Sequence, residues 1–292
     1  MRILVAGWFS IEDGGATAGD VLVRDVACEW LDGLGIPYDV ANEPSMGPGV
    51  DWFRVSPKRY THLVFACGPV GRDLAVAQLI ERFAGSRRIG LNVSIVGDRS
   101  WRPFDVMIER DGRGRGRPDL SILAPRKKVP VVARLHIHRQ AEYPGSRVDE
   151  AHRAFDRLLA ATPAAAFEVD TPLHPEVPGR RSAAEVESLL ARADIALTTR
   201  LHGLVLALAN GVPAVAVDAV PGGAKVLAQA KTLGWPAALA VDEIGDRRLA
   251  ELFEWCLGDE AHERVTECMR AARDASTAVG HELARAVGGA AV

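Results

Sequence analysis

The sequence predicts an α/β protein composed of two Rossmann-like domains with a cleft between them. Short apolar segments alternate with helical patterns along the chain, which is typical of parallel sheets covered by helices on both faces. This alternation lapses between residues 101 and 128 and then resumes. The length of 292 residues also exceeds what one ordinary hydrophobic core supports.

The first half of the chain opens with Ile-Leu-Val-Ala-Gly at residues 3–7, which is typical of a buried parallel strand. A glycine-containing loop follows at residues 13–20, and the helical pattern after it ends at Gly35 and Pro37. The other elements expected in this half are strands at residues 38–40, 62–66 and 89–96 and helices at residues 21–34 and 74–83.

The second half repeats the alternation after an interdomain linker near residues 124–130. We therefore expect an N-terminal domain over residues 1–125 and a C-terminal domain over residues 126–292. Ser182 and Glu185 form the capping box of one helix. The expected strands are residues 129–137, 167–170, 195–197 and 214–217, and the expected helices are residues 149–159, 182–192, 203–209, 225–233, 246–257 and 262–286.

Composition and charge exclude several classes of protein. The formal net charge is −3, so the chain lacks the basic character of a nucleic-acid-binding protein, and we interpret the glycine-spaced basic segment at residues 111–118 as a mobile surface loop. The four cysteines show no C-x-x-C spacing, which suits reduced thiols rather than disulfides or zinc. No secretory signal opens the sequence, and no apolar run approaches the ~20 residues of a membrane-spanning helix. We expect a cytoplasmic protein with no integral membrane segment.

The most informative segment, residues 194–213, runs from an apolar strand into a helix that is apolar on all sides and therefore buried. Asn-Gly at residues 210–211 and the proline after them end this helix. Arg200 and His202 stand at its start, where desolvation of a guanidinium is costly unless it is paired. An anion would offset that cost, because the first-turn N–H groups and the helix dipole favour negative charge. The alternative is that Arg200 pairs with a carboxylate and that His202 is a hydrogen-bonded core residue. Because ligands of open α/β sheets bind at this edge, we predict an anion site at residues 200–202.

The same segment resembles the C-terminal signature of polysaccharide pyruvyl transferases. The resemblance rests on Leu-Thr-Thr-Arg-Leu-His-Gly at residues 197–203, then Ala207, Asn-Gly-Val-Pro at residues 210–213 and Val215. Lys225 follows a glycine pair, at a place where that family also tends to carry a lysine. Thr-Ala-Gly-Asp at residues 17–20 is similar to the family's Asn-x-Gly-Asp, with Thr17 in place of the asparagine.

The resemblance implies a two-lobed fold like that of the type B glycosyltransferases, and an enzyme that is a pyruvyl transferase. Members of the family move a pyruvyl unit from phosphoenolpyruvate onto two hydroxyls of a sugar, giving a cyclic ketal and phosphate. By resemblance, Arg200, Leu201 and His202 would bind phosphoenolpyruvate in the C-terminal domain. The N-terminal domain would then be the acceptor side, for a sugar or glycan.

Charge and proton affinity give each candidate residue a role. The fork of Arg200 suits either anionic end of phosphoenolpyruvate. Lys225 would add a second cation on the same rim, and its alternative role is that of an exposed lysine at a helix start. His202 would bind the phosphate or protonate the leaving group, because the reference pKa of histidine lies near neutrality. Asp20 is the candidate base for the sugar hydroxyls, with helix capping as its alternative role. Asp218, at the end of a strand on the same edge, is a further candidate.

Other polar residues have a lower priority. Arg134 is expected to share a strand face with His136 and His138 and to give the substrate carboxylate a second contact. An H-x-H pair can bind a metal, but with no cysteine or carboxylate motif nearby we interpret it as a polar strand end. His174 lies in a loop after a strand. The glycines of the first loop do not form a dinucleotide fingerprint, and the chemistry requires no cofactor or metal.

Two other functions stay open from the sequence. A type B glycosyltransferase also docks a nucleotide diphosphate at a helix start in its second lobe, although Pro-Gly-Gly-Ala-Lys at residues 221–225 suits a phosphate better than a ribose. A non-catalytic relative that binds an anion is the third reading, because Thr17 departs from the family motif. A lipid-linked acceptor would bring the protein to a membrane surface without an anchor of its own. The sequence specifies neither the acceptor nor the oligomeric state.

Overall fold

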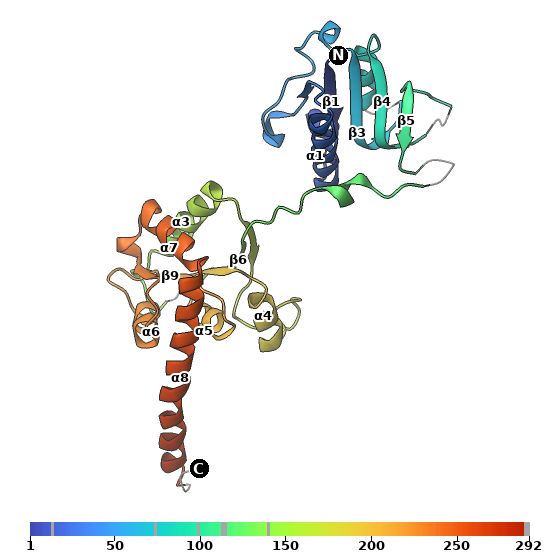
Figure 1. Cartoon of the computed structure of the whole chain (residues 1–292). Helices are drawn as coiled ribbons and strands as arrows, with labels where there is room; N and C mark the ends of the chain where they lie inside the picture. The colour runs from blue at the N-terminus through green and yellow to red at the C-terminus, as the bar shows by residue number, and fades with distance from the viewer. Residues whose placement is uncertain (13–14, 73–74, 98–99, 112–115, 139–140, 289–292) are drawn as a thin grey trace. The chain divides into compact units, whose positions relative to one another are not determined.

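The computed structural model describes residues 1–12, 15–72, 75–97, 100–111, 116–138 and 141–288 (Figure 1). The chain divides into two compact units, Met1–Lys127 and Lys128–Val292. Each unit has its own parallel five-stranded sheet with helices, so the predicted α/β fold of two Rossmann-like domains is confirmed. Within these described ranges, no helix combines the length and the apolar character needed to cross a membrane.

The sheet of the N-terminal domain has the strand order β2-β1-β3-β4-β5, and all neighbours are parallel. Its strands are β1 (Ile3–Gly7), β2 (Tyr38–Val40), β3 (His62–Val70), β4 (Arg87–Ile95) and β5 (Val106–Glu109), and its α-helices in the described residues are α1 (Ala18–Gly33) and α2 (Val76–Arg82). Side chains alternate across the sheet, so that Leu4 and Phe65 pack with α2 whereas Val5 and Val64 pack with α1. Both faces are therefore covered, which explains why β1 and the Leu-Val-Phe-Ala-Cys run of β3 at residues 63–67 are apolar and buried at every position.

The sheet of the C-terminal domain has the order β10-β9-β8-β6-β7, again with all neighbours parallel. Its strands are β6 (Val131–Leu135), β7 (Ala165–Glu168), β8 (Ile195–Thr198), β9 (Ala214–Asp218) and β10 (Ala238–Ala240). Its α-helices in the described residues are α3 (Val148–Ala161), α4 (Ala183–Leu190), α5 (Leu201–Ala209), α6 (Lys225–Leu233), α7 (Asp246–Cys256) and α8 (Asp259–Ala286).

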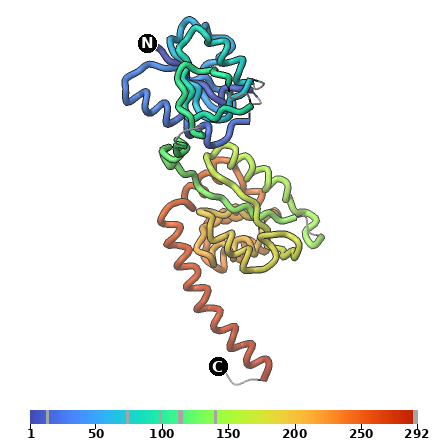
Figure 2. The backbone as a smooth tube through the Cα atoms, turned by 90° about the vertical axis from the view of Figure 1, so that its right-hand side faces the viewer, coloured from blue at the N-terminus to red at the C-terminus, as the bar shows by residue number. Residues whose placement is uncertain are grey.

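Helix α8 is the longest helix described. Its first turns pack on the domain through Ala261, Val265 and Cys268. Beyond Arg273 almost every residue is exposed, and the helix projects away from the C-terminal domain (Figure 2).

The two sheets share one topology. Numbered within its own domain, each has the strand order 2-1-3-4-5, so the order reverses between β1 and β3 in the first domain and between β6 and β8 in the second. In open α/β sheets the crevice beyond the carboxyl ends of the strands, at this reversal, is where ligands bind. The segments that follow β1, β3, β6 and β8 are therefore the first places to look for a site.

Several boundaries differ from the sequence prediction. Strands β5 and β10 were not predicted, because β5 is a half-buried edge strand and β10 is Ala-Leu-Ala, which has little intrinsic strand preference. Strand β3 runs four residues past its predicted end, to Val70. Helix α5 begins at Leu201, two residues before its predicted start, so that Arg200 becomes its N-cap. Residues 112–115, within the expected surface loop, and Gly14 lie outside the described residues.

Candidate functional site

Two threonines fix the turn between β8 and α5. The hydroxyl of Thr198 donates to the carbonyl of Leu135 (3.1 Å) and accepts the N–H of Arg200 (3.0 Å). The hydroxyl of Thr199 accepts the N–H of Ile137 (2.8 Å). The bonds from Thr198 to Leu135 and from Ile137 to Thr199 join the end of β8 to the end of β6. The turn is therefore held at the point where the strand order reverses.

The N-terminus of α5 is open. Arg200 is the N-cap but gives no side-chain cap, and none of the described residues accepts the first-turn N–H groups of Leu201, His202 and Gly203. Gly203 is required for close packing on β8, because a Cβ atom there would lie 2.1 Å from the Thr198 hydroxyl oxygen. Unpaired N–H groups and the positive end of the helix dipole make this turn suitable for an anion.

The guanidinium of Arg200 is half-buried and paired with a carboxylate. Its Nε lies 2.7 Å from Oδ1 of Asp170 and donates to the carbonyl of His136 (2.8 Å), and its Nη2 donates to Oδ2 of Asp170 (3.3 Å). Nη1 of Arg180 lies 3.6 Å from the same carboxylate, and Nε2 of His138 lies 3.8 Å from it. Two guanidiniums around one carboxylate leave this cluster with a net positive charge. The pairing is the alternative that the sequence left open for Arg200.

Sequence reasoning missed Asp170 and Arg180. Asp170 follows β7, the neighbour of β6, and with His136, His138 and Arg180 it lines a pocket of about 340 Å³. The sequence did contain a signal for Asp170, because it is a carboxylate at the carboxyl end of a predicted strand. Arg180 lies in the irregular segment before α4, where no periodicity marks it.

Asp218 has a structural role at the start of α6. Its side chain is 2% exposed, and its two oxygens accept four backbone N–H groups. The donors are Val220 (3.1 Å), Ala224 (2.7 Å), Val226 (2.9 Å) and Leu227 (3.1 Å). The carboxylate therefore occupies the N-terminus of α6 and caps it, which leaves Asp218 a poor choice for a base.

Lys225 opens α6 on the same edge of the sheet. Its ammonium lies 5.1 Å from the centroid of the Tyr143 ring, and it lines a pocket together with His138 and Thr199. His138 therefore contributes to both the Lys225 pocket and the Asp170 pocket. His202 lies at the second position of α5 with an exposed side chain.

Arg134 does not lie at the α5 N-terminus. Its guanidinium lies between Asp156 on α3 (2.6 Å) and Glu168 on β7 (3.1 Å). Arg134 therefore pairs with two carboxylates of the protein, and we do not place it in the anion site.

The expected histidine pair splits into two environments. Strand β6 ends at Leu135, His138 is exposed, and the ring of His136 stacks on that of His152 (4.1 Å between centroids, 14° between planes). Burial, with the positive neighbours His152 and Arg134, lowers the pKa of His136 to about 4. Among the described residues no group of three or more His, Cys, Asp or Glu side chains is placed to hold a metal. His174 is exposed in the loop after β7.

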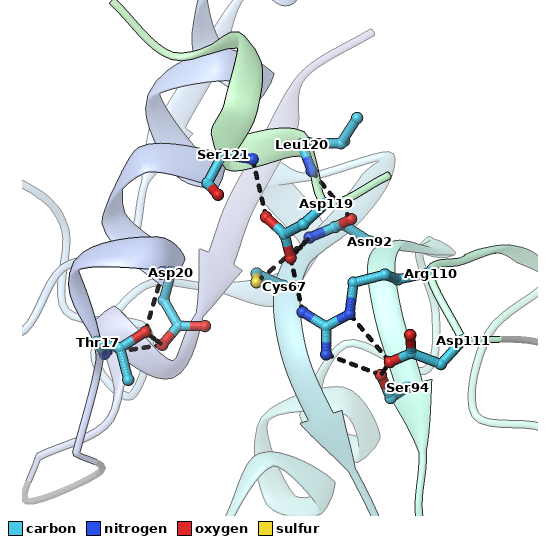
Figure 3. Close-up of polar contacts among 10 residues, drawn as sticks. All are labelled: Thr17, Asp20, Cys67, Asn92, Ser94, Arg110, Asp111, Asp119, Leu120 and Ser121. Carbon is cyan, nitrogen blue, oxygen red and sulfur yellow. Dashed lines mark hydrogen bonds and ion pairs between the residues drawn. The ribbon is translucent and has the colours of Figure 1, made fainter. Parts of the chain in front are cut away.

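In the N-terminal domain, Thr17 is the N-cap of α1, and Asp20 is the third residue of that helix (Figure 3). Its Oδ2 accepts both the N–H and the hydroxyl of Thr17 (2.8 Å each), and the Thr17 hydroxyl accepts the N–H of Asp20 (3.4 Å). This is a capping box, and it is the alternative role that the sequence left open for Asp20. The carboxylate is 7% exposed.

A polar network lies beside Asp20, with its buried members, Cys67 and Asn92, in the second halves of β3 and β4 (Figure 3). Cys67 and Asn92 both have positive φ angles (69° and 57°), and the Asn92 amide donates to the Cys67 sulfur (3.4 Å) and to Asp119 (3.0 Å). Arg110 pairs with Asp119 at 2.7 Å. Burial and the hydrogen bond to Asp20 raise the pKa of Cys67 to about 11, so this thiol is protonated at neutral pH. Non-glycine residues hold positive φ only where the surroundings impose it, so this network fixes the backbone beside the α1 N-terminus.

Comparison with solved structures gives distant similarities. The chain is similar to the glycotransferase of kitacinnamycin, with 12% identity over 92% of this chain and 94% of that chain and a TM-score of 0.34. It is also similar to the UDP-GlcNAc 2-epimerase of Methanocaldococcus jannaschii, with 11% identity over 94% of this chain and 99% of that chain and a TM-score of 0.31. No curated protein matches the chain.

The family comparison falls on the site itself. Residues 131–219 match the sequence model of the polysaccharide pyruvyl transferase family, and this range covers β6 to β9 with the whole β8–α5 turn. The resemblance seen in the sequence is therefore confirmed over these residues. The match identifies the protein as a transferase that modifies polysaccharides, with a polysaccharide pyruvyl transferase segment in its C-terminal domain.

Proposed function

We propose that this transferase moves a pyruvyl group from phosphoenolpyruvate onto two hydroxyls of a sugar or glycan. The observation that carries the proposal is the open N-terminus of α5, with Arg200 as its N-cap, inside the segment that matches the family. Three free N–H groups and a positively charged cluster suit a small ligand that carries both a phosphate and a carboxylate.

In the proposed complex, the phosphate of phosphoenolpyruvate accepts hydrogen bonds from the first-turn N–H groups of Leu201, His202 and Gly203. Arg200 and Lys225 supply positive charge beside it. Asp170 holds Arg200 in place while the site is empty, and Arg180 balances that carboxylate when Arg200 turns to the ligand. His202, exposed on the first turn of α5, is the candidate proton donor.

The reaction balances without a cofactor. Both hydroxyl oxygens bond to C2 of the pyruvyl unit, the C2–O bond to phosphate breaks, and C3 gains a proton to become a methyl group. The two hydroxyl protons end on C3 and on the departing phosphate. Asp20 remains the candidate for the base that accepts a hydroxyl proton, although its Oδ2 is also part of the α1 cap.

Calorimetric titration of phosphoenolpyruvate tests the donor site. Arg200→Ala is expected to weaken binding about 10- to 100-fold, because a hydrogen bond between charged groups contributes about 1.5–3 kcal/mol. Arg200→Lys keeps the charge but not the forked guanidinium, so its affinity for phosphoenolpyruvate is expected to lie between those of the wild type and Arg200→Ala. Arg247→Ala is the matched control, since Arg247 is 93% exposed on α7 of the same domain. Thermal melts of each variant exclude loss of folding as the cause.

The outcomes separate the functions. Phosphoenolpyruvate binding with phosphate release in the presence of a sugar supports pyruvyl transfer. Phosphoenolpyruvate binding without turnover on any acceptor points to a non-catalytic relative. Unchanged affinity in Arg200→Ala, or tight binding of a nucleotide sugar instead, contradicts the proposal. Asp218 already occupies the α6 N-terminus, which speaks against a diphosphate at that second helix.

We also propose a cytoplasmic location, with a sugar acceptor that reaches the protein either free or linked to a lipid. The four cysteines are all free thiols, and three of them are buried, which suits a reducing compartment. Fractionation of cells that express the full chain tests this proposal.

A further inference from the structure

The N-terminal domain contains a large pocket that is separate from the Asp20 network. It lies beyond the carboxyl ends of β1 and β2 and has a volume of about 890 Å³, within the range of roughly 300–1,000 Å³ typical of ligand pockets. Its wall comes from the segment after β1, the glycine-containing loop after β2, and the first turn of α2. We refer to it as the β1–β2 pocket.

One side of the β1–β2 pocket is an aromatic platform. Phe53 is 60% exposed, although it is a large apolar side chain, and its ring lies 4.2 Å from that of Trp52 at an angle of 38°. Trp52 is almost fully buried, and its indole N–H donates to the carbonyl of Ser10 (2.9 Å), so the orientation of the indole ring is fixed. An exposed aromatic face fixed by a buried one is a surface on which a flat apolar face can stack.

The backbone that carries the platform is also fixed. The guanidinium of Arg82 donates to the carbonyls of Trp52 (3.0 Å), Phe53 (2.7 Å) and Val55 (3.2 Å). Within the loop after β2, the Asn42 amide donates to the carbonyl of Pro48 (2.8 Å). The pocket is therefore formed before any ligand enters, which lowers the entropy cost of binding.

Polar groups that can bind hydroxyls line the same pocket. The carboxylate of Glu12 and the amide of Gln78 line the pocket, and neither has a hydrogen-bond or ion-pair partner within the described parts of the chain. Glu43 accepts from the N–H and the hydroxyl of Ser45, which leaves Oε1 available. Carboxylate and amide groups beside an aromatic face match a sugar ring, which has an apolar C–H face and a rim of hydroxyls.

The charge of the pocket narrows the class of sugar. Three carboxylates line it, those of Glu12, Glu43 and Asp51, and no lysine or arginine side chain is among the lining residues. Asp51 has a basic partner, since Nε of Arg54 lies 3.2 Å from its Oδ2. An anionic ligand would be repelled here, in contrast to the positive cluster at Arg200.

We infer that the β1–β2 pocket binds a neutral sugar or an amino sugar, and excludes uronic acids and sugar phosphates. That this sugar is the acceptor of pyruvyl transfer rests on the proposed function, whereas its binding does not. The apolar face of the ring stacks on Phe53, and its hydroxyls or ammonium group bind Glu12, Glu43 and Gln78.

The test is saturation-transfer NMR on the full chain without phosphoenolpyruvate. The probes are the methyl glycosides of glucose, galactose, mannose and N-acetylglucosamine, then glucosamine, glucuronic acid and glucose 6-phosphate. We expect at least one neutral or amino sugar to bind at least 10-fold more tightly than both acids at low salt. Phe53→Ala is expected to weaken that binding at least 10-fold. Trp30→Ala is the matched control, because Trp30 is an aromatic side chain 44% exposed on α1, outside the pocket.

A second variant tests the charge argument independently. Glu12→Gln is expected to raise the affinity for glucuronic acid at least 3-fold, with little change for a neutral sugar. Equal or tighter binding of the acids to the wild type, full affinity in Phe53→Ala, or no binding by any probe would each overturn the inference. Sugar binding that persists in Arg200→Ala, while phosphoenolpyruvate fails to bind the wild type, would reject the proposed function and leave this inference intact.

Discussion

The substitution Asp218→Asn separates a structural carboxylate from a catalytic one. Asp218 is 2% exposed and accepts four backbone N–H groups at the start of α6. Asparagine can place its oxygen where Oδ2 accepts three N–H groups, so the bond from Val220 to Oδ1 is lost and the other three bonds lose the negative charge of their acceptor. At about 1.5–3 kcal/mol for each bond, less what the asparagine oxygen and water recover, we expect a loss of about 3 kcal/mol in the free energy of unfolding.

Thermal unfolding and hydrogen exchange measure this effect. For a domain of this size, about 3 kcal/mol corresponds to a decrease of roughly 6–12 °C in Tm. Because the two domains can unfold separately, peptides that cover residues 225–233 are followed by exchange mass spectrometry, where protection should fall in α6 and not in α1. Asp274→Asn, an exposed aspartate on α8, is the matched control.

Turnover decides between the two roles of Asp218. If the carboxylate only caps α6, the rate per folded molecule should stay within about 3-fold of the wild type at a temperature where the variant is folded. A general base contributes about 10²–10⁴-fold to the rate. A loss of that size in Asp218→Asn, with α6 protection and Tm unchanged, would refute the reasoning from the four hydrogen bonds.

Two further predictions concern the β8–α5 turn and its histidine. Gly203→Ala should lower the free energy of unfolding by about 1–3 kcal/mol in urea titrations, because its Cβ would lie 2.1 Å from the Thr198 hydroxyl oxygen. Gly280→Ala is the control, because a Cβ there would have nothing within 4 Å, and it should not destabilise the protein. Equal effects of the two substitutions would contradict the packing argument. Burial lowers the pKa of His136 from 6.5 to about 4, so its contribution to stability is complete above pH 6.5 and is lost as the pH falls toward 4. Urea unfolding at pH 7, 5.5 and 4.5 should show a smaller acid loss in His136→Gln, and identical pH profiles would exclude this residue as the cause.

Much of the fold was predictable because its signals are local. Buried parallel strands are apolar over several consecutive residues, and helices start and stop at residues that can be recognised, as Ser182 does by accepting the N–H of Glu185. The failures at β5 and β10 have a local cause too, because these edge strands have only four and three residues, too few to show a pattern. The turn at Arg200 was also found locally, since a basic residue at the start of a fully apolar helix is costly without a partner.

What the sequence alone determined is therefore the α/β class, the order of most elements and the place of the turn between β8 and α5, where an anion site stays a prediction. Which charges meet was decided by tertiary structure: Asp170 reaches Arg200 across 30 positions, and Thr198 reaches Leu135 across 63. The carboxylate of Asp218 likewise accepts N–H groups from beyond its own strand, as far along the chain as Leu227, nine positions away. The physical reason is that periodicity and capping act over a few residues, whereas the partner of a buried charge is whichever group the sheet topology brings within hydrogen-bonding distance.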